Sequence, residues 1–274
     1  DEALDQLRRN RITFKRVPWI TEGFILTNSS QNELEKTELY KSGKIWLQSL
    51  ASMVPVAVLS PRSNERILDM TAAPGSKTSQ IAAGLSKGGE LHAFEIDKIR
   101  FERLKHTCKH LGIDECSAIN LKLVCGNAAE LLKVDEFKDY FDAILLDAPC
   151  SAEATIGSEG KRVAASWKIS DVVKNSALQR KLLDTAWGSL KRGGRLIYST
   201  CTFAPEENEL QLSNFLKTNK DCVIDKIAPL NTLNRVPIVE RWEGESIDKS
   251  CKEALRIVPN GEIEGFFIAK LKKV

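Results

Sequence analysis

Two cysteines stand just after apolar runs, each in a short motif that suits covalent chemistry. Cys201 lies in YSTCTFAPEENE and Cys150 lies in LLDAPCSAEAT. A cysteine thiolate is a strong nucleophile, and the hydroxyl groups beside Cys201 can help to stabilise it. Taken singly, either cysteine is more simply explained as a small buried hydrophobe. Because neighbouring parallel strands end at the same rim of a sheet, the pair together favours a shared function on one substrate.

A run of small residues follows an earlier apolar stretch and suits a nucleotide-like ligand. RILDMTAAPGSKTSQIA predicts a strand, a turn and a helix. Such ligands bind where the first strand of a doubly wound sheet ends, because turn N–H groups and a helix N-terminus point there. The turn lacks both the dinucleotide fingerprint and the Walker spacing, which argues against a dehydrogenase and against ATP. The predicted cofactor-binding turn comprises Thr71, Ala72, Ala73, Pro74, Gly75, Ser76 and Lys77.

Polar residues also end the next three predicted strands. Glu95 ends the second strand, where a carboxylate can accept hydrogen bonds from both hydroxyls of a ribose. Asn127 follows the third strand and can hydrogen-bond an adenine edge, and Asp147 ends the fourth. For Glu95 alone, the alternative is an acidic residue at a helix start. With the small-residue turn, these strand ends predict an S-adenosylmethionine pocket rather than a dinucleotide pocket.

Short apolar runs alternate with longer helical patterns from Arg66 onward, which is typical of a parallel sheet with crossover helices. We therefore predict an α/β fold, with Gly193-Gly194 as a helix stop and turn before the fifth strand. The expected strands lie near 66–70, 90–95, 121–125, 143–147, 195–199 and 265–271, and the expected helices over 76–85, 98–111, 172–190 and 205–218.

The residues before this pattern form a different kind of segment. ITFKRVPWITEGFILTN suggests two short strands around a Pro-Trp turn. We expect a small α+β segment over residues 1–47 and a catalytic domain over residues 48–274. Residues 152–173 are polar and rich in small side chains, so they are a candidate lid over the substrate.

Composition narrows the class of protein further. No apolar run approaches the roughly 18 residues of a membrane span, and no signal-peptide core is present, so we expect a cytoplasmic protein without a membrane partner. The net charge of +3 permits a nucleic-acid partner without requiring one. Seven cysteines without CxxC spacing and only three histidines predict neither a metal site nor a disulfide framework. We expect a monomer.

Four separate motifs resemble those of one enzyme family. DMTAAPGSKT, LLDAPCSAE, GGRLIYSTCTFAPEENE and LRIVPNGEIEGFFIAKLKKV are similar, in order and spacing, to the signatures of Sun/Fmu-type RNA cytosine-5 methyltransferases. The resemblance covers residues 46–274, and VPWITEGFIL with the APGSKT spelling looks most like the RsmF-type ribosomal RNA enzymes. It implies a Rossmann-like, S-adenosylmethionine-dependent fold with a mostly parallel seven-stranded sheet and an N-terminal extension that recognises RNA.

The resemblance also implies roles for the motif residues. The turn wraps the methionine part of the cofactor, Glu95 holds the ribose, and Cys201 is the nucleophile that adds to carbon 6 of cytosine. Cys150 is linked to product release. Asp147 either contacts the cytosine or contacts only the cofactor. Asn127 stands where the family usually has aspartate, which keeps an acceptor but removes a charge.

Several alternatives stay open from the sequence. Small-subunit rRNA is the expected substrate, with tRNA as the alternative. A DNA cytosine-5 methyltransferase would use Cys150 as its nucleophile, and a catalytically silent RNA-binding or ribosome-assembly factor would keep only the fold.

Two further assignments concern residues around the cysteines. The basic N-terminal cluster, with Lys161, Arg162 and the Trp167 region, is the candidate for holding the RNA backbone. Pro205-Glu206-Glu207 is typical of a first helical turn, so we predict that these glutamates begin a helix rather than join the site.

Overall fold

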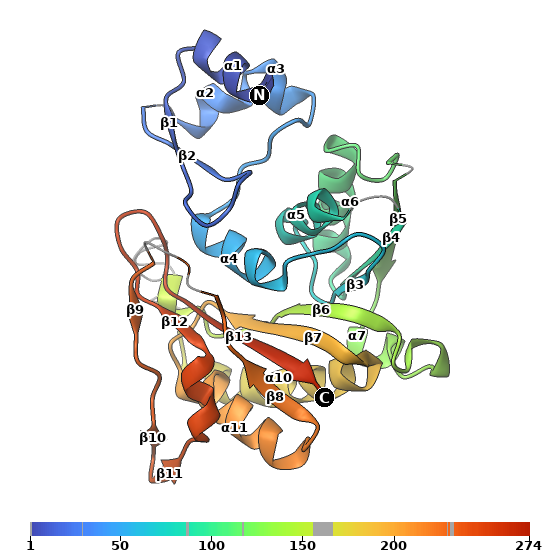
Figure 1. Ribbon diagram of the computed structural model, residues 1–274, viewed down its shortest axis with the longest axis vertical. Coiled ribbons are helices and arrows are strands. Elements are labelled where there is room, and N and C mark those ends of the chain that lie inside the picture. The colour runs from blue at the N-terminus through green and yellow to red at the C-terminus, as the bar shows by residue number, and fades with distance from the viewer. Residues whose placement is uncertain are drawn as a thin grey trace.

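A nine-stranded sheet lies at the centre of the computed structural model (Figure 1), which describes residues 2–28, 30–85, 88–116, 118–155, 167–228, 230 and 233–274. Its strands, in spatial order, are β5 (Ile119–Cys125), β4 (Gly89–Glu95), β3 (Arg66–Asp69), β6 (Phe141–Asp147), β7 (Leu190–Thr200), β13 (Phe266–Lys273), β12 (Leu255–Ile257) and β9 (Arg235–Val236), and β8 (Cys222–Asp225) pairs with β13.

The sheet has a parallel half and an antiparallel half. Strands β5, β4, β3, β6 and β7 pair in parallel. Strand β13 runs antiparallel to β7, β8 and β12, and β12 runs antiparallel to β9. The predicted α/β fold with a largely parallel sheet is confirmed. The sheet exceeds the expected seven strands because residues 219–260, whose apolar pattern is irregular, contribute three short strands.

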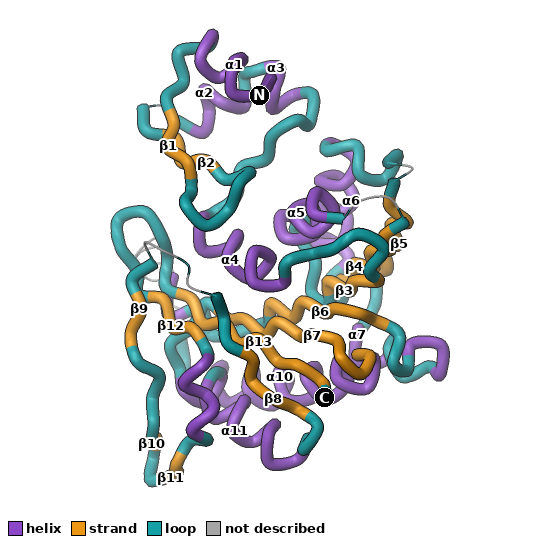
Figure 2. Tube along the Cα trace, viewed as in Figure 1, coloured by secondary structure: helices purple, strands orange, loops and turns teal. Residues whose placement is uncertain are grey.

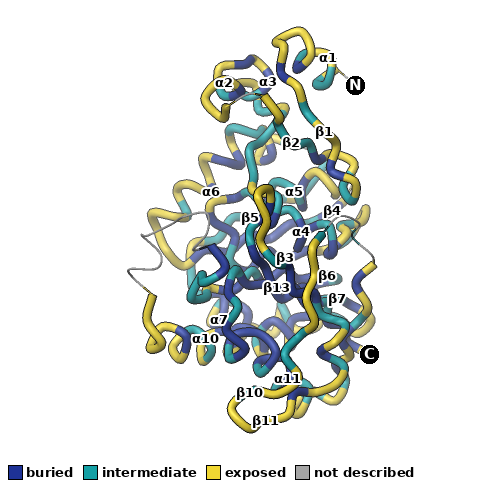
Figure 3. The backbone as a smooth tube through the Cα atoms, turned by 90° about the vertical axis from the view of Figure 1, so that its left-hand side faces the viewer, coloured by how far each residue is buried: buried dark blue, intermediate teal, exposed yellow. Residues whose placement is uncertain are grey.

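Helices cover both faces of the sheet, as Figures 1 and 2 show. Successive strand residues alternate between the two layers: Ile67 and Leu145 pack with one group of helices, and Leu68 and Leu146 pack with the other. The first layer holds α4 (Leu50–Leu59), α5 (Ser76–Gly84) and α6 (Lys98–His110), and the second holds α7 (Ala128–Leu131), α10 (Ile169–Ser189) and α11 (Glu209–Thr218). Figure 3 shows the inner strands β3 and β13 as mostly buried, between helices that are more exposed.

The N-terminal residues form a small unit beside α4 (Figure 1). The two expected strands are present as an antiparallel pair, with Pro18 and Trp19 in the connection between them. Leu7, Leu34 and Leu39 belong to a separate small core. The elements are α1 (Glu2–Arg9), β1 (Phe14–Arg16), β2 (Phe24–Leu26), α2 (Gln31–Glu35) and α3 (Glu38–Lys41), and elsewhere β10 (Arg241–Trp242) pairs with β11 (Glu245–Ser246).

The prediction for Gly193-Gly194 was wrong. Helix α10 ends at Ser189 and β7 begins at Leu190, so the two glycines lie inside the strand rather than in a turn before it. The pairing of β7 with β6 shifts register there, and Gly193 has a φ of +80°. An irregularity of this kind suits glycine because it has no Cβ to clash at positive φ.

Among the described helices, none combines the length and the apolar character needed to cross a membrane.

Candidate active site

The two predicted cysteines meet at the ends of β6 and β7. These strands pair in parallel, with Asp147 opposite Ser199, so the residues that follow them lie side by side. The Sγ atoms of Cys150 and Cys201 are 3.4 Å apart, and both side chains are partly buried. One small substrate atom placed at this rim can therefore contact both thiols.

The surroundings of the Cys150 thiol oppose its ionisation. The hydrogen bond with Cys201, together with burial, holds the pKa of the Cys150 thiol well above its usual range. Cys150 therefore keeps its proton at neutral pH and can act as the S–H donor between the two sulfurs. Cys201 Sγ can then be the acceptor in this contact.

Asp147 connects the cysteine pair to the predicted cofactor turn. Its Oδ1 accepts a hydrogen bond of 2.7 Å from the Ser199 hydroxyl. Its Oδ2 lies 2.6 Å from Lys77 Nζ, which also donates to Ser52 Oγ at 2.8 Å. Thr71 Oγ1 donates to the Asp147 backbone carbonyl at 2.8 Å. Lys77 thus points from the cofactor turn toward the end of β6, the strand that leads to Cys150.

The small-residue turn packs closely against α6. Gly75 has a φ of +109°, and a Cβ at that position would lie 3.0 Å from the Thr107 side chain. The Thr107 hydroxyl donates to the Pro74 carbonyl at 2.7 Å, and α5 begins at Ser76. Ala72 and Ala73 are buried. The turn therefore brings its backbone, rather than bulky side chains, to the end of β3.

Asp69 lies beneath this turn and was not singled out from the sequence. It is fully buried at the end of β3, where its Oδ2 accepts a hydrogen bond of 2.7 Å from Thr78 Oγ1. Burial raises the pKa of this carboxyl to about 6. Through this hydrogen bond Asp69 connects the end of β3 to helix α5 across the turn.

Glu95 ends β4 with one carboxylate oxygen left for a ligand. Its side chain is buried, and Oε1 accepts a hydrogen bond of 2.9 Å from Asp97 N. No donor among the described residues hydrogen-bonds to Oε2, although Arg100 Nη1 lies 3.5 Å away. A buried acceptor without a donor calls for an explanation, and a ligand hydroxyl is the kind of donor that would satisfy it. This end of β4 fits the ribose of S-adenosylmethionine.

Asn127 lies at the same edge of the sheet and also caps a helix. Gly126 N donates to the Glu95 carbonyl at 2.8 Å, which holds the ends of β5 and β4 together. Asn127 Oδ1 accepts from Ala129 N at 3.0 Å and so caps α7. Its amide N–H₂ is then the group that can contact an adenine edge.

The Glu207 side chain points inward to Ser151, the residue after Cys150, contrary to the prediction for its motif. Residues Pro205–Glu207 do form a 3-10 turn before α11, but the Glu207 side chain is fully buried. Its carboxylate accepts hydrogen bonds from Ser151 N at 3.1 Å, from Ser151 Oγ and from Gln179 Nε2 at 2.9 Å. Burial raises the pKa of Glu207. The local sequence carries no signal for this inward orientation, because one of the donors that Glu207 meets, Gln179, lies 28 residues earlier in the chain.

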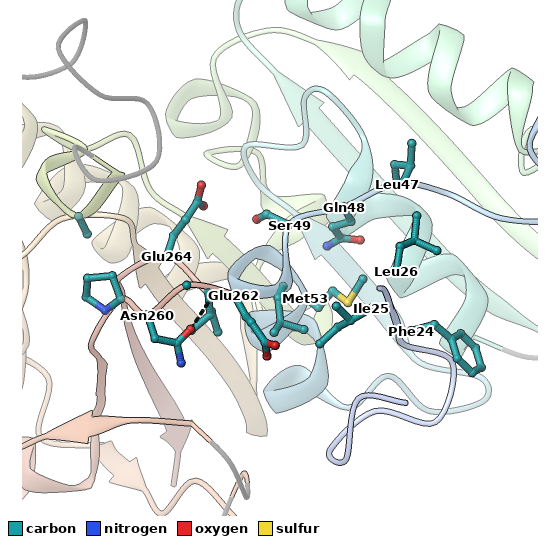
Figure 4. A pocket seen from close by; sticks show the side chains of 15 residues that line it. Phe24, Ile25, Leu26, Leu47, Gln48, Ser49, Met53, Asn260, Glu262 and Glu264 are labelled. Carbon is teal, nitrogen blue, oxygen red and sulfur yellow. Dashed lines mark hydrogen bonds between the residues drawn. The ribbon is translucent and has the colours of Figure 1, made fainter. Parts of the chain in front are cut away.

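A groove of about 620 Å³ borders the cysteine loops on the side of the N-terminal segment. Figure 4 shows Ile25 and Met53 on one side of it and Asn260 and Glu264 on the other. Ala154 forms part of its wall and donates its backbone N–H to the Cys201 carbonyl at 3.1 Å. One wall of the groove is therefore hydrogen-bonded to the Cys201 backbone, although neither cysteine is among the residues that line it.

The structure describes only some of the candidate RNA-contacting residues. Lys161 and Arg162 lie outside the described residues, and Trp167 is 36% exposed. In the basic N-terminal cluster, Lys15 forms an ion pair with Glu262 beside the groove, and Arg8 pairs with Asp5.

Comparison with known proteins gives one consistent family. The family model described as 16S rRNA methyltransferase RsmB/F matches residues 56–272. The tRNA (cytosine(49)-C(5))-methyltransferase of Pyrococcus abyssi is 35% identical over 275 residues, which cover 99% of this chain and 84% of that protein. Ribosomal RNA small subunit methyltransferase F of Citrobacter koseri is 34% identical over 262 residues, covering 94% of this chain. The chain spans about half the length of that second relative.

Solved structures agree with these relatives. A methyltransferase homolog protein from Pyrococcus horikoshii superposes with a TM-score of 0.83 and 32% identity, covering 100% of this chain and 82% of that chain. NSun6 from Pyrococcus horikoshii gives a TM-score of 0.70 and 30% identity, covering 93% of this chain and 60% of that one. With four motifs, two neighbouring cysteines and a family match over most of its length, the chain belongs to the 16S rRNA methyltransferase RsmB/F family.

Proposed function

We propose that this protein is an S-adenosylmethionine-dependent RNA methyltransferase that forms 5-methylcytosine. The observation that carries the proposal is the 3.4 Å approach of the Cys150 and Cys201 sulfur atoms at the rim of a pocket that fits the cofactor. Membership of the RsmB/F family supports RNA as the class of substrate, since the two relatives named above are enzymes that methylate rRNA or tRNA.

The cofactor is held by the turn of residues 71–77 and by Glu95. Backbone groups of the turn take the methionine part, and Glu95 Oε2 takes a ribose hydroxyl, because this buried oxygen has no hydrogen-bond donor among the described residues. The Asn127 amide is placed to contact adenine. Bound there, the cofactor supplies an electrophilic methyl group.

Cys201 activates the cytosine for this transfer. Carbon 5 of cytosine is a weak nucleophile, and addition of the Cys201 thiolate to carbon 6 makes it electron-rich enough to accept the methyl group. A base then removes the proton from carbon 5, and the bond between carbon 6 and sulfur breaks. Cys150, which keeps its proton, donates a hydrogen bond to the departing Cys201 thiolate across the 3.4 Å gap and so assists product release.

Asp147 orients the groups on both sides of the reacting base. Its carboxylate already accepts from Ser199 and from Lys77, so it joins the Cys201 strand to the cofactor turn. Asp147 can also accept a hydrogen bond from the amino group of a cytosine placed at the rim. Proton donation from Asp147 to the ring is the less favoured role, since both of its oxygens already accept hydrogen bonds from these two partners.

The RNA reaches the cysteines along the groove beside the N-terminal segment. A base inside a duplex cannot enter such a site, so the target is single-stranded or flipped out of its stack. We assign residues 1–47 to RNA recognition because β2 forms one side of the groove. Small-subunit rRNA is the proposed substrate, and tRNA is the second candidate because the Pyrococcus abyssi relative is named as a tRNA enzyme.

Transfer of label from methyl-labelled S-adenosylmethionine tests the proposal. Purified protein is incubated with 16S rRNA, small ribosomal subunits, tRNA and duplex DNA, and labelled 5-methylcytosine is measured after digestion. We expect label in RNA with the wild type and none with Cys201→Ala. Labelled DNA that depends on Cys150 would support a DNA methyltransferase instead. Cofactor binding without labelling of any substrate would support a silent assembly factor, and either result would overturn the proposal.

A further inference from the structure

Glu207 lies at the centre of a buried hydrogen-bond network around Cys150. We propose that Glu207 is a positioning residue, which fixes the loop of Cys150 in the place where this thiol assists product release. The inference rests on the function proposed above, and it assigns a role to a residue that touches neither the cofactor turn nor the predicted nucleophile.

The network holds the peptide groups on both sides of Cys150. Gln179 Nε2 donates to the Pro149 carbonyl at 2.8 Å, on one side of the cysteine. Ser151 N donates to the Glu207 carboxylate at 3.1 Å, on the other side. The same Gln179 nitrogen also donates to Glu207 Oε1 at 2.9 Å. The two side chains therefore close a bridge across the Cys150 residue.

The side chains that form this bridge are buried away from solvent, so water cannot readily replace the Glu207 carboxylate if it is removed. The side chains of Glu207 and Gln179 are both fully buried. If the carboxylate is removed, Ser151 N and Gln179 Nε2 lose a partner that water cannot replace without rearrangement. The short loop between β6 and the 3-10 turn Glu153–Thr155 then loses the bonds that Ser151 makes to Glu207, and it keeps only the Gln179–Pro149 bond, the Ser151 Oγ–Thr202 Oγ1 contact and the Ala154–Cys201 backbone bond.

The loop of Cys201 is held by other groups. Asn208 accepts from Thr200 Oγ1 at 2.6 Å and donates to the Thr202 carbonyl at 3.0 Å. The Tyr198 hydroxyl donates to the backbone carbonyl of Glu207 at 2.6 Å, and this bond does not use the Glu207 side chain. One contact joins the two loops, between Ser151 Oγ and Thr202 Oγ1 at 2.8 Å. The bonds of Asn208 and Tyr198 remain when the carboxylate is truncated, so the Cys150 loop should be affected more than the nucleophile.

The test compares methyl transfer with product release in Glu207→Ala. The methyl group transferred in a single turnover should stay within about two-fold of wild type, because Cys201 keeps its supports. Steady-state turnover should fall by about ten- to a hundred-fold, the loss expected when a reacting group moves by about 1 Å. A covalent protein–RNA adduct should accumulate on denaturing gels, as it should in Cys150→Ala.

Three variants separate positioning from a general loss of structure. Glu207→Gln should restore turnover, because its amide oxygen can still accept from Ser151 N and its amide nitrogen can donate to Ser151 Oγ. Glu206→Ala is the matched control, since its side chain accepts from Trp242 Nε1 at 2.8 Å and belongs to the same turn. It should show no adduct. If Glu207→Ala does not fold, Gln179→Leu removes the tie to Pro149 and should give the same accumulation.

The outcomes distinguish this inference from the proposed function. An adduct in Cys150→Ala but none in Glu207→Ala or in Gln179→Leu would overturn the positioning role alone. Equal loss of single-turnover transfer and steady-state turnover in Glu207→Ala would do the same, because it would indicate damage to the whole site. Absence of an adduct in Cys150→Ala itself would count against the proposed role of Cys150.

Discussion

Asp69 should make the stability of the protein depend on pH in an unusual direction. Its carboxyl group is fully buried beneath the cofactor turn, where burial raises its pKa from an ordinary 3.8 to about 6. The hydrogen bond from Thr78 Oγ1 offsets only part of that desolvation. The folded state therefore holds the Asp69 proton at pH values where the unfolded chain has already released it.

The size of the effect follows from the difference in pKa. Each unit corresponds to about 1.4 kcal/mol, so a rise from 3.8 to about 6 corresponds to about 3 kcal/mol. Below about pH 4 Asp69 is protonated in both the folded and the unfolded state, so its titration does not lower the free energy of unfolding. As the pH rises from about 4 to about 6, the unfolded state loses the proton first, and the free energy of unfolding falls by up to that amount. Above about pH 6 the loss is complete.

Denaturant unfolding of wild type and Asp69→Asn from pH 4 to pH 7.5 measures this contribution. Asparagine keeps an acceptor for Thr78 but does not titrate, so the difference between the two proteins isolates Asp69 from all other carboxyls. We expect wild type to lose stability relative to the variant by about 2 to 3 kcal/mol over this range. A difference that stays constant with pH, or that grows in favour of wild type as the pH rises, would refute the reasoning.

Two further substitutions test the cofactor site and the buried ion pair near α11. Glu95→Gln should weaken S-adenosylmethionine binding by about 10- to 100-fold in calorimetry, the contribution of a charged hydrogen bond, while leaving the melting temperature nearly unchanged; unchanged affinity would contradict the ribose assignment. Arg256→Met leaves the fully buried Glu209 without its partner at 2.7 Å, so the free energy of unfolding should fall by about 3 to 5 kcal/mol. The exposed pair of Lys41 and Glu38 is the control, since Lys41→Met should cost less than about 1 kcal/mol, and equal losses would contradict the argument from burial.

The strand ends could be predicted because their signals are local. Apolar runs that end in Glu95 and Asp147 are short and buried on both faces, so they are recognisable without tertiary information. Parallel pairing then brings the following cysteines together, and the 3.4 Å distance between Cys150 and Cys201 agrees with that expectation.

Other parts of the structure depend on contacts that a local pattern does not contain. Helix α4 contains Pro55 and is apolar on nearly every side, so it lacks the amphipathic period that identifies a helix. It nevertheless brings Ser52 to Lys77. Strands β9 and β12 are two and three residues long. They are defined by tertiary pairing, since β12 adds to the edge of β13 and β9 adds to the edge of β12.

Glu207 combines a local conformation that the sequence predicts with a side-chain orientation that tertiary contacts decide. Its local sequence predicts a helix start, and a 3-10 turn does form there. Whether the carboxylate points outward to water or inward to Ser151 depends on Gln179, which lies 28 residues earlier on α10. The residues near Glu207 in the sequence therefore do not determine which way its carboxylate points.

Identification of the residue that bonds to the base tests the proposed mechanism most directly. Wild-type protein is incubated with cofactor and substrate RNA that contains 5-fluorocytosine, whose fluorine cannot be removed as the carbon 5 proton is, so the covalent adduct is trapped. Peptide mass spectrometry then locates the nucleotide. The mechanism predicts that the modified cysteine is Cys201, and a nucleotide attached to Cys150 would contradict it.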